Sequence, residues 1–215
     1  MTVAQFCLDH LVCEVPRLGT ATGFAWYELD WDDPVVTRTC ADDHVPRPGR
    51  VIAATRRGPT DVVDEVLPTL PAGAVTHLQF EVPHAPDGHD AVVAVRTAGF
   101  IPIPARHLPA APSDQDALRS TAESLAALGT GLIKVVFPAT DAAHLRWAET
   151  LLREWPHDRV GLSLTPAGTR QGRLGAALAG SRLVFAPLSD TAERMSASWY
   201  RRLVTPSPDV RPEGD

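Results

Sequence analysis

A single lysine is the residue of this sequence that most clearly indicates chemistry. The 20 basic residues are 19 arginines and Lys134, and this lysine lies within GLIKVVF, the most apolar short run of the chain. Removal from water disfavours the charged ammonium, so burial here would lower the pKa of the amine. A neutral lysine amine is a nucleophile that can add to a carbonyl group. The alternative is a structural lysine near a strand end, whose ammonium reaches water.

Polar side chains alternate with apolar ones in two other segments, as expected of strands with one polar face. In YELDWD the acidic residues Glu28, Asp30 and Asp32 occupy alternate positions. In HLQFEV the polar positions also alternate, and they include Glu81. The other polar residues at the ends of apolar runs are Arg56, Arg57, Arg106 and His107. Together they predict a pocket for a small, anionic substrate; the alternative is a half-exposed sheet whose polar face meets solvent.

The elements that would position these residues follow from the periodicity of the sequence. Short apolar runs rich in β-branched or aromatic residues predict eight strands: Ala4–Val12, Phe24–Trp31, Arg50–Arg56, Val75–Val82, Gly99–Ala105, Gly131–Phe137, Arg159–Thr165 and Arg182–Leu188. Amphipathic patterns predict helices at Ser113–Leu128, Thr140–Glu154, Arg170–Ala179 and Thr191–Val204, with weaker signals at Thr60–Leu67 and Asp87–Thr97. Ser113 with Asp116 resembles a capping box, and Thr140 is the expected cap of the next helix.

Alternating strands and helices are typical of parallel β/α units, and eight such units predict an α/β fold, the (β/α)₈ TIM barrel. The barrel is a shortened one, with trimmed helices in its N-terminal quarter, where residues 33–49 contain three prolines and no amphipathic pattern. We expect one barrel domain over residues 1–205 and a disordered tail at 206–215. The alternative is an open doubly wound sheet, but neither GxGxxG nor GxxxxGK[ST] follows the first strand.

Composition excludes several classes of protein. The formal charge is −6 and no basic block is present, which argues against a nucleic-acid partner. No apolar run approaches the ~20 residues needed to cross a bilayer. The three cysteines have no disulfide or metal-ligand pattern, which is typical of reduced thiols in a cytoplasmic protein. We expect no metal, because the histidines of HAPDGHD are better explained by a turn, and we expect His144 on a polar helix surface.

Several segments also match the motifs of one known family. APS before a helix, followed by Gly129 and LIKVVFP, resembles its TPS-helix-LGADIxKIAVMP pattern. GRL around Arg173 resembles its SRL, and Gly180-Ser181 with the strand ending at Phe185 resembles its GSxxTFG. In the N-terminal half, YELDWD resembles ExRxD, ATR resembles TxR, and QFE resembles DxE. The chain thus resembles a diverged member of the type I 3-dehydroquinate dehydratases.

This resemblance implies a (β/α)₈ barrel, commonly a homodimer, that dehydrates its substrate through a Schiff base on a lysine and needs no cofactor. It places Lys134 on the Schiff-base lysine. It places Arg173 on the arginine that helps hold the substrate carboxylate. Glu28 and Arg56 would contact ring hydroxyls, and Glu81 would belong to the same substrate-binding set.

The sequence departs from the family pattern at three places. The family's histidine motif HDF reads RHL here, so an ungapped match puts Arg106 at the histidine position and His107 one residue later. Asp30 replaces the arginine of ExRxD, which reverses the charge. In the last loop, Ala192 and Ser196 stand where the family has a serine and a glutamine that contact the carboxylate.

A proton shuttle is still needed, and histidine is the common choice because its pKa lies near neutrality. His107 is the best candidate by position, and His77 is the second. Arg106 cannot serve, since a guanidinium keeps its proton. It could instead lower the pKa of Lys134 by repulsion or bind an anionic group of the substrate.

Three functions remain open. The first is a dehydratase, a carbon–oxygen lyase that forms a Schiff base with a cyclic or polyhydroxylated keto acid and has diverged from the housekeeping shikimate-pathway reaction toward secondary metabolism. The second is a non-catalytic barrel that binds a metabolite or a protein partner. The third is a lysine-dependent class I aldolase. The sole lysine favours the first over the second, and the GRL and GSxxxF segments disfavour the third.

Overall fold

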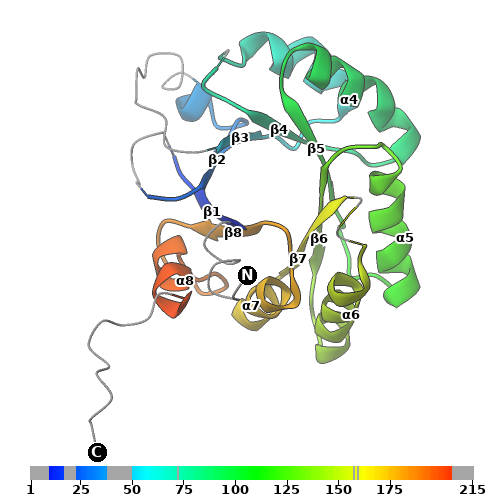
Figure 1. Cartoon of the computed structure of the whole chain (residues 1–215), viewed down its shortest axis with the longest axis vertical. Coiled ribbons are helices and arrows are strands. Elements are labelled where there is room, and N and C mark those ends of the chain that lie inside the picture. The colour runs from blue at the N-terminus through cyan, green and yellow to red at the C-terminus, as the bar shows by residue number, and fades with distance from the viewer. Residues whose placement is uncertain are drawn as a thin grey trace, which may run out of the picture.

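The computed structural model describes residues 10–16, 23–37, 50–71, 73–156, 158 and 160–204. Its eight strands are parallel and follow the order β7-β6-β5-β4-β3-β2-β1-β8, in a sheet that curls into a nearly closed barrel with the helices outside (Figure 1). The strands are β1 (Leu11–Glu14), β2 (Trp26–Asp30), β3 (Arg50–Ala54), β4 (His77–Glu81), β5 (Ile101–His107), β6 (Leu132–Pro138), β7 (Gly161–Ala167) and β8 (Val184–Pro187). The predicted (β/α)₈ barrel is confirmed.

Hydrogen bonds at the start of β8 connect the two ends of the sheet. The Arg182 amide donates to the Leu162 carbonyl at 2.8 Å, and the Leu183 amide donates to the Ser163 hydroxyl at 3.0 Å. Ser163 is fully buried in β7, and its hydroxyl accepts the Leu183 amide in place of a backbone carbonyl. These contacts join β8 to β7 although the two strands share no regular ladder.

The helices surround the barrel in chain order. They are α3 (Pro59–Asp61) with its π-helical and 3₁₀ continuations η1 (Val62–Val66) and η2 (Leu67–Thr69), η3 (Ala85–Asp87), α4 (Gly88–Thr97), α5 (Gln115–Ala126), α6 (Ala142–Glu154), α7 (Arg170–Ala179) and α8 (Ala197–Val204). None of the described helices has the length and apolar character needed to cross a bilayer.

Two predicted helix caps are wrong by one residue. The side chain of Asp114, not Ser113, accepts the Ala117 amide at the start of α5. The side chain of Asp141, not Thr140, accepts two amides at the start of α6. In both places an aspartate follows the predicted residue, and its carboxylate is a stronger acceptor than a hydroxyl at the positive end of a helix.

His144 on α6 is buried, which corrects the expectation of a polar surface residue. Its Nδ1 accepts the backbone amide of Thr140 at 3.2 Å, and its ring lies 5.1 Å from that of Trp147. Trp147 packs against the hydrophobic core, and so does Trp199. His144 therefore satisfies an amide of the loop before α6 from a buried position.

The N-terminal quarter is the least regular part of the barrel. Among the described residues between β1 and β2 none is helical, and between β2 and β3 only residues 34–37 are. This agrees with the predicted trimming. β1 ends at Glu14, two residues later than predicted, and residues 4–9 of the predicted strand lie outside the described residues, as do Cys7, Cys40 and the predicted tail.

α8 begins at Ala197, six residues later than predicted, because residues 190–196 form a loop instead. Within it, the Asp190 carboxylate accepts the Ser196 amide at 2.6 Å. The predicted helices at Arg170–Ala179 and Asp87–Thr97 agree with α7 and α4 to within a residue.

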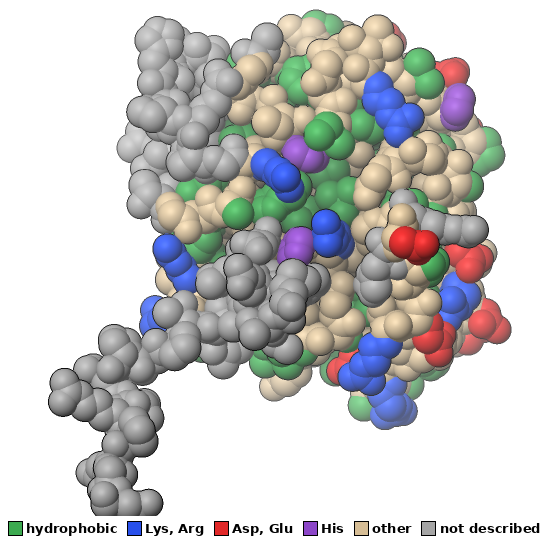
Figure 2. Space-filling model, viewed as in Figure 1, with side chains coloured by type: hydrophobic (Ala, Val, Ile, Leu, Met, Phe, Trp, Pro, Cys, Tyr) green, Lys and Arg blue, Asp and Glu red, His purple; other side chains and the backbone are tan. Residues whose placement is uncertain are grey.

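Apolar side chains fill two layers of core. The larger layer lies between the sheet and the helices, and a smaller cluster fills the barrel interior: Val12, Trp26, Ile52, Ile103, Leu132, Leu183 and Phe185. Figure 2 shows hydrophobic side chains in the middle of the molecule, with Lys, Arg and His side chains beside them. Apolar side chains of the described strands therefore pack the barrel interior, as is usual for this fold.

The interior also holds a buried histidine. His77 opens β4 beside the ring of Trp26, with 4.9 Å between ring centroids, and its Nδ1 lies 2.8 Å from the Thr76 hydroxyl. Burial, with a smaller contribution from the charge of Arg50, lowers the pKa of His77 to about 4. His77 is thus a neutral part of the barrel core, and its predicted role as a second proton shuttle is not supported.

Candidate active site

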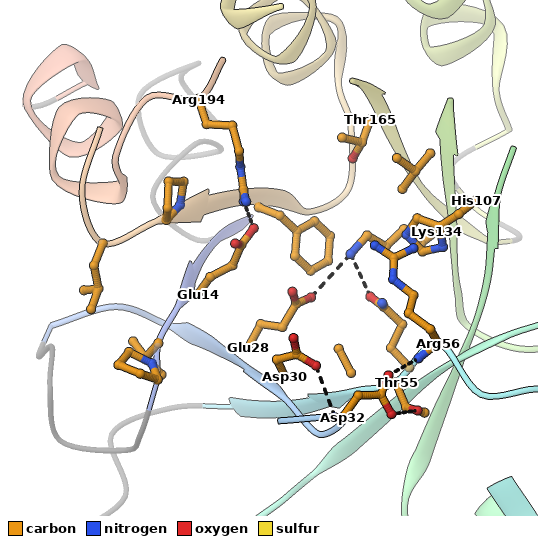
Figure 3. Close-up of a pocket in the computed structure, with 18 of the residues that line it drawn as sticks. Glu14, Glu28, Asp30, Asp32, Thr55, Arg56, His107, Lys134, Thr165 and Arg194 are labelled. Carbon is orange, nitrogen blue, oxygen red and sulfur yellow. Dashed lines mark hydrogen bonds and ion pairs between the residues drawn. The ribbon is translucent and has the colours of Figure 1, made fainter. Parts of the chain in front are cut away.

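A pocket of about 740 Å³ opens where the strands end at their carboxyl termini. In a (β/α)₈ barrel this is the end at which the βα loops form active sites. The pocket brings together Glu28, Arg56, His107 and Lys134, which lie in strands or directly after them (Figure 3), and Arg173 from α7. These are five of the seven predicted site residues. The sixth, Glu81, lies directly behind His107, and the seventh, Arg106, faces the other way.

Lys134 projects from β6 into the base of this pocket, where only 5% of the residue is exposed. Its Nζ donates to Gln79 Oε1 at 2.9 Å and to Glu28 Oε2 at 3.3 Å (Figure 3). It also lies 3.4 Å from the centroid of the Phe185 ring. The amine is therefore held in place by contacts with β4, β2 and β8, and its position is defined before any substrate arrives.

Burial lowers the pKa of Lys134, as the apolar run around it predicted. The charge of Glu28 and its hydrogen bond oppose this shift, and the charges of Arg56 and Arg173 add to it. The net direction is downward. A lowered pKa increases the fraction of neutral amine at neutral pH, which is the form that attacks a carbonyl.

His107 lies at the end of β5 and is paired with a carboxylate from β4. Its Nδ1 is 2.6 Å from Glu81 Oε2, and its backbone amide donates to Glu81 Oε1 at 2.8 Å. A carboxylate at Nδ1 favours the tautomer that carries the proton there, which leaves Nε2 as the acceptor. Glu81 thereby orients the imidazole so that its second nitrogen can act as a base.

Burial lowers the pKa of His107, and the charges of Arg56 and Lys134 lower it further, against the opposing effect of Glu81. The imidazole is therefore neutral at neutral pH and able to accept a proton. Burial acts to raise the pKa of Glu81, but the hydrogen bonds from His107 outweigh it and keep this carboxylate ionised.

The register of β5 and β6 decides which residue of RHL reaches the pocket. Ala105 pairs with Lys134 and His107 pairs with Val136, so His107 and Lys134 lie on the same face of the sheet. Arg106 lies on the opposite face, where its Nε donates to the Val82 carbonyl at 2.9 Å and its Nη1 to the Ser124 hydroxyl at 3.2 Å. The expectation that Arg106 binds substrate or repels Lys134 is therefore not supported.

Carboxylates gather on the side of the pocket formed by β1 and β2. Glu28 contacts Lys134, and Asp30 and Asp32 follow it toward the mouth (Figure 3). Asp32 accepts the Thr55 hydroxyl at 2.6 Å and the Arg56 amide at 2.7 Å, which ties the end of β2 to the end of β3.

Two guanidinium groups face this acidic side without carboxylate partners among the described residues. Arg56 follows β3, and Arg173 lies in the first turn of α7. The Nε of Arg173 is buried and has no hydrogen-bond partner. An unpaired buried donor on a permanent cation suits a carboxylate of a ligand.

Sequence reasoning missed the ion pair between Glu14 and Arg194, which also lines the pocket (Figure 3). The pair joins the end of β1 to the loop before α8. Glu14 was overlooked because β1 was predicted to end before it, and Arg194 because its loop was predicted to be helix. Gln79 was visible in the alternating pattern of its strand but was not assigned to the site.

No group of three or more His, Cys, Asp or Glu residues is arranged to hold a metal ion in the part of the chain that the structure describes. Burial raises the pKa of the Cys13 thiol to about 11, which keeps it protonated. Among the described residues that line the pocket, the Lys134 amine and the His107 imidazole are the groups suited to nucleophilic and acid–base chemistry.

Solved structures match about nine-tenths of this chain. The 3-dehydroquinate dehydratase of Geobacillus kaustophilus aligns with a TM-score of 0.69 and 14% identity, over 91% of this chain and 89% of its own. The type I enzyme of Clostridium difficile, with covalently modified comenic acid, gives 0.70 and 12% over 91% of both chains. The enzyme of Aquifex aeolicus gives 0.65 and 15% over 90% and 96%. This chain shares its fold with the 3-dehydroquinate dehydratases.

The similarity to these dehydratases is one of structure and not of overall sequence. No protein-family model matches the chain, and no curated protein matches it. The carboxyl transferase domain of Rhizobium etli pyruvate carboxylase aligns less well, with a TM-score of 0.54 and 13% identity over 73% of this chain and 34% of its own. The dehydratase barrel is thus matched over nearly its full length, and the carboxylase barrel only in part.

Proposed function

We propose that the protein is a dehydratase that forms a Schiff base between Lys134 and a cyclic or polyhydroxylated keto acid. The observation that carries this proposal is the buried amine of Lys134 on the same barrel face as the carboxylate-paired His107, on the neighbouring strand. The shared fold with the dehydratases and the matching motifs support the same reaction class. The anionic group of the substrate would bind Arg173, and Arg56 would lie beside it.

The reaction begins when the neutral amine of Lys134 adds to the ketone carbon. The carbonyl oxygen leaves as water, after accepting protons, and a protonated imine remains on Nζ. Glu28, 3.3 Å from this nitrogen, stabilises the positive charge that the imine carries. Gln79 holds the nitrogen from the other side and orients the imine in the pocket.

The protonated imine acidifies the adjacent carbon. His107 takes a proton from that carbon through Nε2, and the electron pair forms an enamine. The enamine then expels the β-hydroxyl, which leaves as water with the proton that His107 returns. Hydrolysis of the imine consumes one water, releases the unsaturated keto acid and restores the lysine amine. The net reaction is the loss of one water, with no redox change.

The test uses the fact that this chain has a single lysine. Incubation with 3-dehydroquinate or related keto acids, followed by borohydride, should reduce the imine and add the mass of the ligand to the intact protein. Lys134→Ala should abolish the adduct while its circular dichroism and thermal melting show that it is folded. The N-terminal amine is the only other primary amine, and digestion with peptide mapping separates the two. The absence of an adduct with every keto acid would contradict the proposal and favour a non-catalytic barrel.

A further inference from the structure

The charged groups at the mouth of the pocket are not all paired. Glu28 contacts Lys134, and Glu14 contacts Arg194. Asp32 is held by Thr55, by the Arg56 amide and by Arg57, whose Nε lies 3.5 Å away. Asp30 is the exception among these carboxylates. Among the described residues, its carboxylate accepts one hydrogen bond, from the backbone amide of Asp32 at 3.1 Å, and has no cationic partner.

Asp30 lies at a defined place in the site. It is two residues beyond Glu28 on the same face of β2, which puts it roughly 7 Å farther toward the mouth. Its partner on β3 is Ala54, whose methyl group leaves the carboxylate uncovered on that side. Asp30 therefore lies on the mouth side of Glu28, whose carboxylate contacts the nitrogen that would bind the keto carbon.

The charges around Asp30 favour a cationic group of a ligand over an anionic one at this position. Glu14, Glu28 and Asp32 line the same side of the pocket, so a second anionic group placed here would meet several carboxylates. The cations without carboxylate partners, Arg56 and Arg173, also line the pocket. A ligand that complements all of these charges carries an anionic group for the arginines and a cationic group for Asp30.

We propose that the substrate of the Lys134 site is an amino-substituted keto acid, and that Asp30 selects it by binding its ammonium group. This inference rests on the proposed function for the position of the keto carbon. The ammonium would donate to the free carboxylate of Asp30, which is a charge-assisted hydrogen bond. The cyclic keto acid would thus be zwitterionic, with its carboxylate at Arg173 and its ammonium at Asp30.

The test compares two ligands that differ at one substituent: 3-dehydroquinate, and an analogue with an amino group in place of one ring hydroxyl. Both are titrated against the full-length protein at pH 7 with borohydride, and the fraction of adduct is measured by intact mass. The wild type should reach half-maximal labelling at about tenfold lower concentration of the amino compound. Asp30→Asn should remove this preference, and the matched surface variant Asp90→Asn on α4 should retain it.

The outcomes separate the inference from the proposed function. Equal labelling by both compounds in the wild type would overturn the role of Asp30 and leave the Schiff base intact. A preference that persists in Asp30→Asn would also overturn it. If neither compound forms an adduct, the proposed function fails, and calorimetric binding of the same pair without borohydride decides the inference. Tighter binding of the amino compound that Asp30→Asn abolishes would then uphold it, and equal or absent binding would overturn it.

Discussion

At the level of single residues, two opposing effects act on the pKa of Lys134. Burial favours the neutral amine that attacks a carbonyl, whereas Glu28 favours the ammonium. The same carboxylate that opposes the first step would stabilise the protonated imine that follows. Such a site has less neutral amine before the substrate binds, but it stabilises the protonated imine that forms afterwards.

Glu28→Gln tests this balance. Removal of the negative charge should lower the pKa of Lys134 further, because the opposing contribution is lost. The pH profile of borohydride-trapped adduct should therefore shift toward lower pH than in the wild type. Thermal melting serves as the control for folding. A profile that stays in place or moves to higher pH would contradict the assignment of Glu28 as the charge that opposes burial.

His107→Gln separates imine formation from proton transfer. The variant keeps Lys134 and its contacts, so it should still form the adduct with borohydride. Dehydration should fall by about 10²–10⁴-fold, which is the usual contribution of a positioned acid–base group. Product release, followed by the ultraviolet absorbance of the conjugated keto acid, measures this loss. Full dehydration activity in the variant would mean that another group moves the proton.

At the level of elements, short polar contacts decide where helices begin. In α5 the carboxylate of Asp114 accepts the Ala117 amide at 2.8 Å, and Ser113 reaches only the Asp114 side chain. The sequence predicts a cap at the start of this helix, but the capping residue is Asp114, one position after the predicted Ser113. Which of two neighbouring polar residues caps a helix depends on the backbone conformation at the first turn.

Asp114→Ala should lower the free energy of unfolding by about 1 kcal/mol, because an amide at the start of α5 loses its acceptor. Ser113→Ala should cost distinctly less, since its hydroxyl makes no contact with a helix amide. Urea denaturation of the two variants beside the wild type measures the difference. A larger loss for Ser113→Ala would restore the cap predicted from the sequence.

At the scale of the whole molecule, the barrel separates a packed interior from a charged mouth. His77 belongs to the interior, where it is 5% exposed and its pKa is lowered to about 4. The pocket at the carboxyl ends of the strands holds Lys134 and His107. The homodimer implied by the family resemblance stays a prediction, because one chain alone does not test it.

The buried His77 makes stability depend on pH. Its pKa is about 4 in the folded state and 6.5 when unperturbed, so the unfolded chain binds more protons between these values. The stability contributed by the neutral ring is complete above pH 6.5 and is lost as the pH falls toward 4, by about 3 kcal/mol in total. Below pH 4 this loss levels off.

His77→Gln isolates this contribution, since glutamine can still bond to Thr76 but does not titrate. The difference in the free energy of unfolding between wild type and variant should change by that amount from pH 7 to pH 4. His107 and the carboxylates titrate in both proteins and cancel in the difference. Parallel curves over this range would show that His77 is not the neutral interior group that its position indicates.

The sequence by itself determined the number of strands, the barrel and the lysine at its centre. Each of these is recorded locally, because apolar runs, amphipathic spacing and the setting of Lys134 can be read within a few residues. The position of acidic residues near the strand ends could also be predicted, because side chains on one face of a strand recur every two residues. These features did not depend on knowing which strands are neighbours.

The tertiary structure alone decided which of two adjacent residues enters the pocket and which charges find partners there. His107 faces Lys134 and Arg106 faces away because of the register between β5 and β6, and a shift of one residue would exchange them. Glu14 and Arg194 meet across 180 positions of the chain. Among the described residues, Asp30 has no cationic partner, whereas Glu14, Glu28 and Asp32 each have one. Contacts of this kind arise when the barrel closes, so no local pattern specifies them.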